Sequence, residues 1–90
     1  MGLEGKVAIV TGAAQAIGYA TAWELALEGA AVTVADIQEE RGMAVAAAMR
    51  ADGRRALFVE TDVGDPEQLE RMVAATAAEF GRVDILVNNA

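Results

Sequence analysis

The stretch KVAIVTGAAQAIG, residues 6–18, decides the fold of this chain. Its apolar run at residues 7–10 is uninterrupted, which is typical of a strand buried on both faces of a parallel sheet. Thr11 and Gly12 end the run, and a helix is predicted to begin near Ala16. A glycine turn between a strand and a helix N-terminus can hold a dinucleotide pyrophosphate, because glycine lets the backbone approach the phosphates. The alternative is an ordinary strand-to-helix turn.

Apolar runs and helical patterns alternate along the rest of the chain. Helices are predicted over residues 16–28, 38–52 and 65–80, and further strands over residues 31–36, 55–61 and 84–88. The order β-α-β-α-β-α-β indicates parallel strands joined by crossover helices. We therefore expect an α/β fold, a partial doubly wound parallel sheet with four strands in the order 3-2-1-4 and three helices.

The composition argues against several classes of function. Fourteen acidic residues against seven basic ones give a net charge of −7, so we expect neither nucleic acid nor an anionic membrane as a partner. The chain contains no cysteine, histidine or serine, so we expect no disulfide, no metal site and no serine nucleophile. No apolar run approaches the roughly 18–20 residues that span a bilayer. We predict a cytoplasmic protein.

Asp36 ends the second predicted strand, at a suitable distance downstream to meet the adenosine ribose of a dinucleotide. A carboxylate there hydrogen-bonds a free 2′-hydroxyl and repels a 2′-phosphate, so the predicted cofactor is NAD(H) in preference to NADP(H). No basic residue follows at Ile37, and Arg41 is interpreted as a solvated helix residue. A plain turn residue is the alternative interpretation of Asp36.

Two further polar segments fall at ends of predicted strands. Asp62 and Val63 follow the third strand, where they could meet an adenine ring, although a role in starting the next helix is an equal alternative. Asn88 and Asn89 end the fourth strand, where amides more often bind or brace than catalyse.

These segments, taken together, resemble the short-chain dehydrogenases/reductases. The matching motifs are Thr11-Gly12-x-x-x-Ala16-Ile17-Gly18, Asp36-Ile37, Asp62-Val63 and Asp84-Ile85-Leu86-Val87-Asn88-Asn89-Ala90. The resemblance implies a Rossmann-like fold and an oxidoreductase that moves a hydride between a nicotinamide dinucleotide and an alcohol or carbonyl substrate. It implies cofactor-binding or cofactor-bracing roles for Gly12, Gln15, Ile17, Gly18, Asp36, Ile37, Asp62, Val63, Asn88 and Ala90.

The chain departs from the family pattern at two points. Ala16 stands where the family has its middle glycine, and a positive φ there would cost alanine roughly 1–2 kcal/mol. The resemblance implies that the catalytic residues are a serine and the tyrosine and lysine of a Tyr-x-x-x-Lys helix. Here the only tyrosine and lysine are Tyr19 and Lys6, which are in the wrong order. We therefore assign no catalytic residue.

Three hypotheses remain open. Residues 1–90 are expected to be the N-terminal dinucleotide-binding half of a Rossmann-type domain, truncated after the fourth strand and inactive alone. The alternatives are a free-standing NAD-binding module without catalysis, or a self-associating fragment with no ligand. A homo-oligomer is expected through the open edge of the fourth strand or through the less covered face of the sheet.

Overall fold

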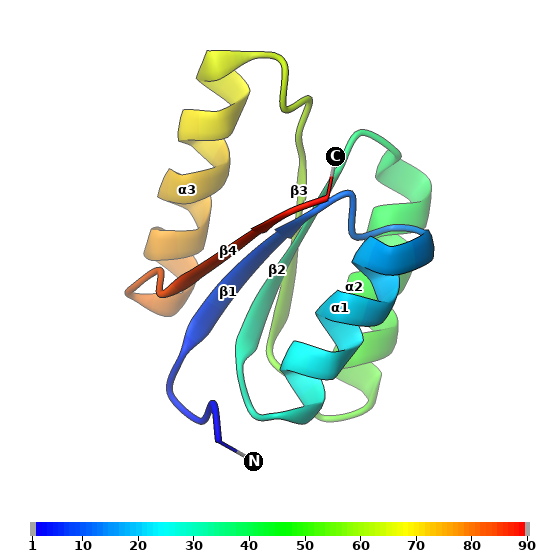
Figure 1. Cartoon of the computed structure of the whole chain (residues 1–90), viewed down its shortest axis with the longest axis vertical. Helices are drawn as coiled ribbons and strands as arrows, with labels where there is room; N and C mark the ends of the chain where they lie inside the picture. Colours follow the sequence, from blue (N-terminus) through cyan, green and yellow to red (C-terminus); the bar gives the residue numbers. More distant parts are fainter. Residues whose placement is uncertain (1, 90) are drawn as a thin grey trace.

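Four parallel strands form one sheet, and the apolar run that follows Lys6 becomes one of its two inner strands (Figure 1). The computed structural model describes residues 2–89. The strands are β1 (Val7–Thr11), β2 (Ala31–Asp36), β3 (Ala56–Glu60) and β4 (Ile85–Asn88), and the helices are α1 (Ala16–Leu27), α2 (Glu39–Ala51) and α3 (Pro66–Phe80). The strand order β3-β2-β1-β4 and the α/β class confirm the prediction, and each element bound lies within one residue of the predicted one.

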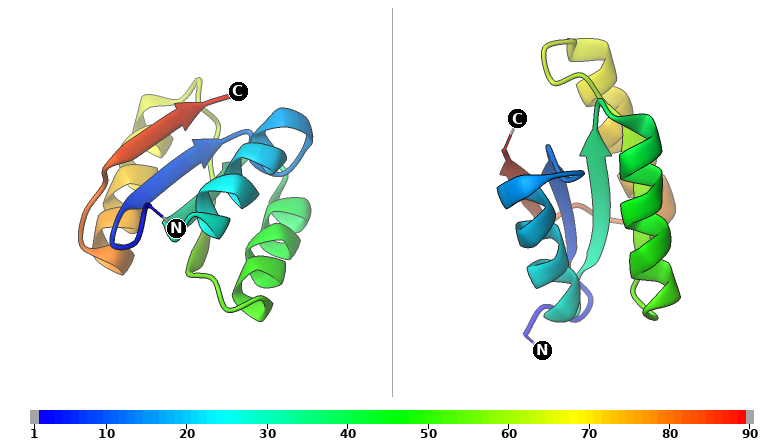
Figure 2. Two further views of the ribbon diagram at one scale, coloured as in Figure 1. Left: turned by 60° about the horizontal axis from the view of Figure 1, so that its bottom comes forward. Right: turned by 90° about the vertical axis from the view of Figure 1, so that its right-hand side faces the viewer.

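The helices cover the two faces of the sheet unequally. Helices α1 and α2 lie side by side on one face, and α3 lies alone on the other (Figures 1 and 2). Every residue of β1 and β2 is buried, as expected for strands covered on both sides. The larger core lies under α1 and α2 and is built on Val10, Val32 and Val34, whereas Ile9 and Met72 centre the smaller core under α3.

Helix α3 is tied to the sheet by a buried pair of hydroxyls. The Thr76 hydroxyl donates to the carbonyl oxygen of Met72 at 2.8 Å, and it lies 2.8 Å from the hydroxyl of Thr33 on β2. Since Thr76 has a single proton to donate, Thr33 donates to Thr76. This chain of two hydrogen bonds satisfies both hydroxyls inside an otherwise apolar interface.

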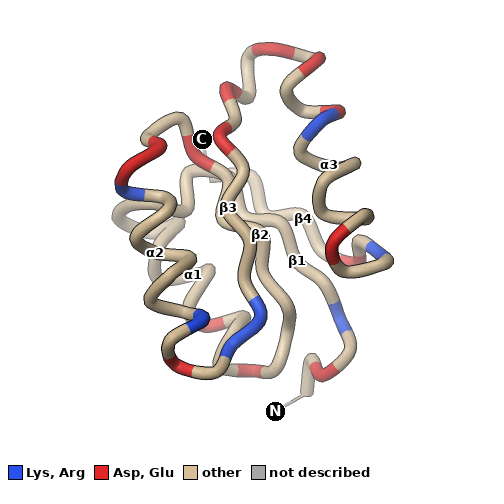
Figure 3. Tube along the Cα trace, turned by 180° about the vertical axis from the view of Figure 1, so that it is seen from behind, with Lys and Arg blue, Asp and Glu red and all other residues tan. Residues whose placement is uncertain are grey.

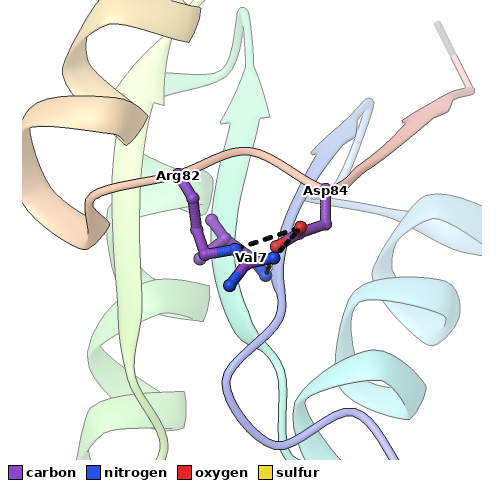
Figure 4. Close-up of polar contacts among 3 residues, drawn as sticks. All are labelled: Val7, Arg82 and Asp84. Atoms are coloured by element: carbon purple, nitrogen blue, oxygen red, sulfur yellow. Dashed lines mark hydrogen bonds and ion pairs between the residues drawn. The ribbon is translucent and has the colours of Figure 1, made fainter.

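An acidic staple joins the start of β4 to the start of β1 (Figure 4). The carboxylate of Asp84 accepts from the backbone N–H of Val7 at 2.9 Å and from the guanidinium of Arg82 at 2.7 Å. The Arg82 hydrogen bond and then the Val7 N–H stabilise the charged carboxylate, so the pKa of Asp84 lies below its ordinary value. This staple is at the amino end of the strands.

Candidate cofactor site

The carboxyl ends of the strands border a hollow of about 420 Å³. Ligands of doubly wound sheets bind at this edge, where the strand order reverses, which here is between β1 and β4. Among the residues expected to meet a cofactor, those that line the hollow are Gly12, Gln15, Ile17, Gly18, Asp36, Ile37, Asp62 and Val63. Ala16, Gln38, Thr61 and Asn89 also line it, although the sequence analysis did not select them.

The glycine turn brings the N-terminus of α1 close to the end of β1. A methyl group added at Gly18 would collide with the carbonyl group of Gly12, so no side chain fits at residue 18. Gly12 has a φ of 64°, in the left-handed region that glycine adopts without strain. Gly18, Ala22 and Ala26 form the buried face of α1, as the small-residue spacing implies. At Gly12 and Gly18, which both line the hollow, the turn therefore presents backbone without a side chain.

Ala16 adopts the left-handed conformation, with a φ of 55°. It is the one non-glycine residue with a positive φ within residues 2–89. The strain cost expected for a positive φ at this position therefore applies, because alanine occupies a backbone conformation that favours glycine. Its side chain lines the hollow and is exposed, so nothing packed beneath the methyl group compensates for the strain.

Asp36 is an anchor for the turn as well as a candidate ligand for ribose. Its carboxylate accepts from the backbone N–H of Ala14 at 3.0 Å and from that of Gln38 at 2.9 Å. The residue is only 5% exposed, yet it lines the hollow. Each carboxylate oxygen has two lone pairs, so each can accept a further hydrogen bond from a ligand. The carboxylate is held in place before any ligand arrives.

Two apolar side chains stand exposed beside these polar groups. Ile17 is 74% exposed and Ile37 is 62% exposed, and both line the hollow. Leaving two large aliphatic groups in water is costly unless a partner covers them, since each buried CH₂ is worth about 0.8 kcal/mol. Two exposed aliphatic side chains in one hollow suit a ligand with flat, apolar faces.

Asp62 takes part in the entry to α3 and also lines the hollow. Its carboxylate accepts from the backbone N–H of Gly64 at 2.9 Å, and its own N–H donates to the side chain of Gln68 at 2.8 Å. Asp65 caps α3 by accepting from the N–H of Glu67 at 3.0 Å. Asp62 thus shapes the entry to α3 and, with the half-buried Val63, also lines the hollow.

The end of β4 braces β1 and contributes less to the hollow. The hydroxyl of Thr11 donates to the side-chain oxygen of Asn88 at 2.9 Å and accepts from the N–H of Asn89 at 3.0 Å. Asn88 does not line the hollow, whereas Asn89 does. Ala90, the last residue expected to contact a cofactor, lies outside the described residues.

One contact at the hollow was not anticipated from the sequence. The guanidinium of Arg41 donates to the side-chain oxygen of Gln15 at 2.9 Å and so joins α2 to the glycine turn. Arg41 was interpreted as a solvated helix residue, and it is indeed exposed. Its place near the start of α2 was the available signal in the sequence. The positive end of the helix dipole disfavours a cation there, which indicates that Arg41 has a contact outside its own helix.

The acidic character of the chain is visible around this edge. Acidic residues lie along the segment between β3 and α3 and at the start of α2 (Figure 3). Asp36 and Asp62 are the charged residues among those that line the hollow. Residues 2–89 contain no helix long and apolar enough to cross a membrane, and no cluster of metal-ligating side chains was found among them.

Comparison with known proteins identifies the family. The family model described as short chain dehydrogenase matches residues 6–90. The chain is 53% identical over 89 residues to short chain dehydrogenase/reductase AstE of Aspergillus oryzae, covering 98% of this chain and 34% of that protein. It is 46% identical over 92 residues to human 15-hydroxyprostaglandin dehydrogenase [NAD(+)], covering 100% of this chain and 35% of that protein.

Comparison with solved structures indicates the same family. The fold superposes on a hydroxysteroid dehydrogenase from Escherichia coli with a TM-score of 0.94 and 36% identity, covering 98% of this chain and 37% of that one. The chain therefore belongs to the short-chain dehydrogenase family, whose members use nicotinamide cofactors. It spans about a third of the length of the curated relatives that it matches.

Proposed function

We propose that residues 1–90 form the N-terminal cofactor-binding half of a short-chain dehydrogenase and that they bind NAD(H) in preference to NADP(H). The observation that carries the proposal is the buried, pre-positioned carboxylate of Asp36 beside the glycine turn. It can accept from a ribose 2′-hydroxyl, and it repels a 2′-phosphate. The human relative whose name includes NAD(+) supports the same preference.

The lining of the hollow fits a dinucleotide. Its volume lies within the roughly 300–1,000 Å³ typical of cofactor pockets. The backbone of the turn and the N-terminus of α1 would receive the pyrophosphate, while Asp62 and Val63 would meet the adenine edge and face. Ile17 and Ile37 would be covered in the process. When bound, the nicotinamide supplies the hydride acceptor or donor.

Catalysis is proposed to need residues outside this segment. Tyr19 is 44% exposed on α1 and does not line the hollow, so it has no place in proton transfer to a substrate there. In the complete enzyme we propose hydride transfer with an alcohol or carbonyl substrate, in the cytoplasm. The purified 90-residue chain should accordingly bind cofactor and turn over no alcohol or ketone.

A charge introduced into the hollow tests the binding site. Ile17→Glu places a carboxylate beside the proposed pyrophosphate and should raise the Kd for NADH by about tenfold or more, which corresponds to roughly 1.4 kcal/mol. Met43→Glu is the matched control, because Met43 is also exposed (55%) and lies on α2 away from the hollow. Calorimetry and NADH fluorescence measure both. Equal weakening by the two variants, or no binding by the wild type, contradicts the proposal.

The open edge of β4 favours a second property, self-association. Among residues 2–89, β4 pairs only with β1. Its Leu86, in register with Ile9 on the α3 side of the sheet, is 60% exposed because α3 does not contact β4. We propose that two copies associate there. Sedimentation should show a dimer that Leu86→Lys dissociates and that Val73→Lys, on exposed α3 surface, does not. A wild-type monomer at high concentration argues against it.

A further inference from the structure

The outer edge of β3 is the second open edge of the sheet. Within residues 2–89, β3 pairs only with β2. The carbonyl of Arg55 accepts from the N–H of Val32 on β2. Because the backbone groups of successive strand residues point to opposite sides, the odd-numbered residues of β3 bond to β2 and the even-numbered ones point outward. The outward residues are Ala56, Phe58 and Glu60. Such an edge can accept a further strand.

One of the outward groups is occupied by a side chain. The guanidinium of Arg50, in the last turn of α2, donates to the carbonyl oxygen of Ala56 at 3.1 Å. Within the described part of the chain, no other side chain bonds to the outward backbone groups of β3. An added strand would run about 4.7–4.9 Å from β3, so the guanidinium stands where the backbone of that strand would have to lie.

The charges along β3 favour one arrangement of an added strand. Arg54 precedes the strand and Glu60 ends it, so β3 is basic at its start and acidic at its end (Figure 3). A parallel second copy would oppose like charges, whereas an antiparallel copy opposes unlike charges. With Leu57 opposite its own counterpart, each Arg54 lies opposite Glu60 of the second copy. In the same register Ala56 and Phe58 exchange both N–H···O=C bonds across the pair.

We propose that the outer edge of β3 is a docking strand for a second copy of this chain, and that Arg50 keeps it closed. The antiparallel register uses the carbonyl of Ala56 in both copies, so each copy has to release its own Arg50 before the strands pair. Each released charge-assisted hydrogen bond is worth about tenfold in an equilibrium constant, and two of them weaken the pair about hundredfold. Association at the edge of β4 therefore ends at a dimer and does not continue through β3.

Sedimentation in a background without β4 association tests this edge alone. The Leu86→Lys chain is compared with the double variant Leu86→Lys/Arg50→Ala, in which alanine keeps the last turn of α2 helical. The dimer Kd should fall about hundredfold in the double variant, even though the chain becomes more acidic. The matched control, Leu86→Lys/Arg41→Ala, removes the same charge from α2 at a site bonded to Gln15, and it should not lower the Kd.

Two charge reversals test the antiparallel register. Adding Glu60→Arg to the double variant opposes like charges and should return the chain to a monomer. Adding Arg54→Glu as well should restore the dimer. Amide hydrogen exchange supplies an independent signature. The outward N–H of Phe58 should gain protection in the dimer, whereas the N–H of Leu57, which faces β2, should keep the protection that it has in the monomer.

Each alternative outcome contradicts a stated part of the proposal. Equal dimer Kd values with and without Arg50→Ala refute the closing role of Arg50. Association that Glu60→Arg does not disrupt, or that leaves the N–H of Phe58 unprotected, refutes β3 as the docking strand. Association accompanied by loss of the thermal unfolding transition is aggregation of unfolded chain and also counts against it. Cofactor binding is tested separately by the NADH titrations, so its failure and the failure of this inference are distinguishable.

Discussion

Replacing Ala16 with glycine tests whether the turn before α1 carries backbone strain. Ala16 has a φ of 55°, where the Cβ of an L-residue crowds its own backbone. The methyl group is exposed, so its removal sacrifices no buried contact. Glycine should therefore stabilise the folded chain at a position where helix propensity alone predicts the opposite.

The magnitude is the difference between two effects. The left-handed conformation costs alanine roughly 1–2 kcal/mol, and glycine removes that cost. Glycine also gives the unfolded chain more freedom, which offsets about 0.4–1 kcal/mol. The net gain in the free energy of unfolding therefore lies between about 0 and 1.6 kcal/mol. Its centre, about 0.8 kcal/mol, corresponds to a rise in Tm of roughly 3–6 °C for a domain of this size.

Thermal and urea unfolding of two variants provides the assay. Ala20→Gly is the matched control, since Ala20 is exposed within the regular part of the same helix. It should lower stability by about 1 kcal/mol, so the two glycine variants should change stability in opposite directions. Ala16→Gly should also tighten NADH binding, because the methyl group lines the hollow. If Ala16→Gly is as destabilising as Ala20→Gly, the strain argument is wrong.

Three other perturbations have defined outcomes. Gly18→Ala should unfold the turn and abolish NADH binding, because the added methyl group has no space; near-wild-type binding and Tm would contradict the packing argument. The staple formed by Asp84 and Arg82 should stabilise the fold above the ordinary carboxyl pKa, and this stability should be lost as pH falls through the lowered pKa. Asp84→Asn should remove that acid-dependent step from unfolding curves recorded between neutral pH and pH about 2. Thr76→Val strands the buried hydroxyl of Thr33 and should cost about 1–3 kcal/mol, with Thr33→Val restoring part of it.

The fold could be predicted because local patterns and topology rules agree. The apolar run of β1 has no polar residue to turn toward water, so it required cover on both faces. Short crossovers then left few strand orders, and the observed order is the predicted one. The hollow followed from the same logic, since parallel strands bring their carboxyl ends to one edge.

Side-chain partners could not be read in the same way. Gln15 and Arg41 are 26 positions apart, and no pattern along the chain states that a guanidinium from α2 reaches the turn. The hydrogen bond from the Thr11 hydroxyl to the Asn88 side chain depends in the same way on the pairing of β1 with β4. Such contacts are set by distances across elements, whereas the sequence specifies mainly which elements form and which faces they bury.

The double use of Asp36 determines how cofactor preference has to be measured. Its carboxylate accepts two backbone N–H groups, and an amide in its place would turn an N–H donor toward one of them. Any substitution at Asp36 therefore disturbs the turn as well as the ribose contact, and a loss of NADH affinity cannot be assigned to either. The turn is common to both cofactors, so its disturbance cancels in the ratio of NADPH to NADH affinities. A change in that ratio therefore reports contacts at the 2′-position of the ribose.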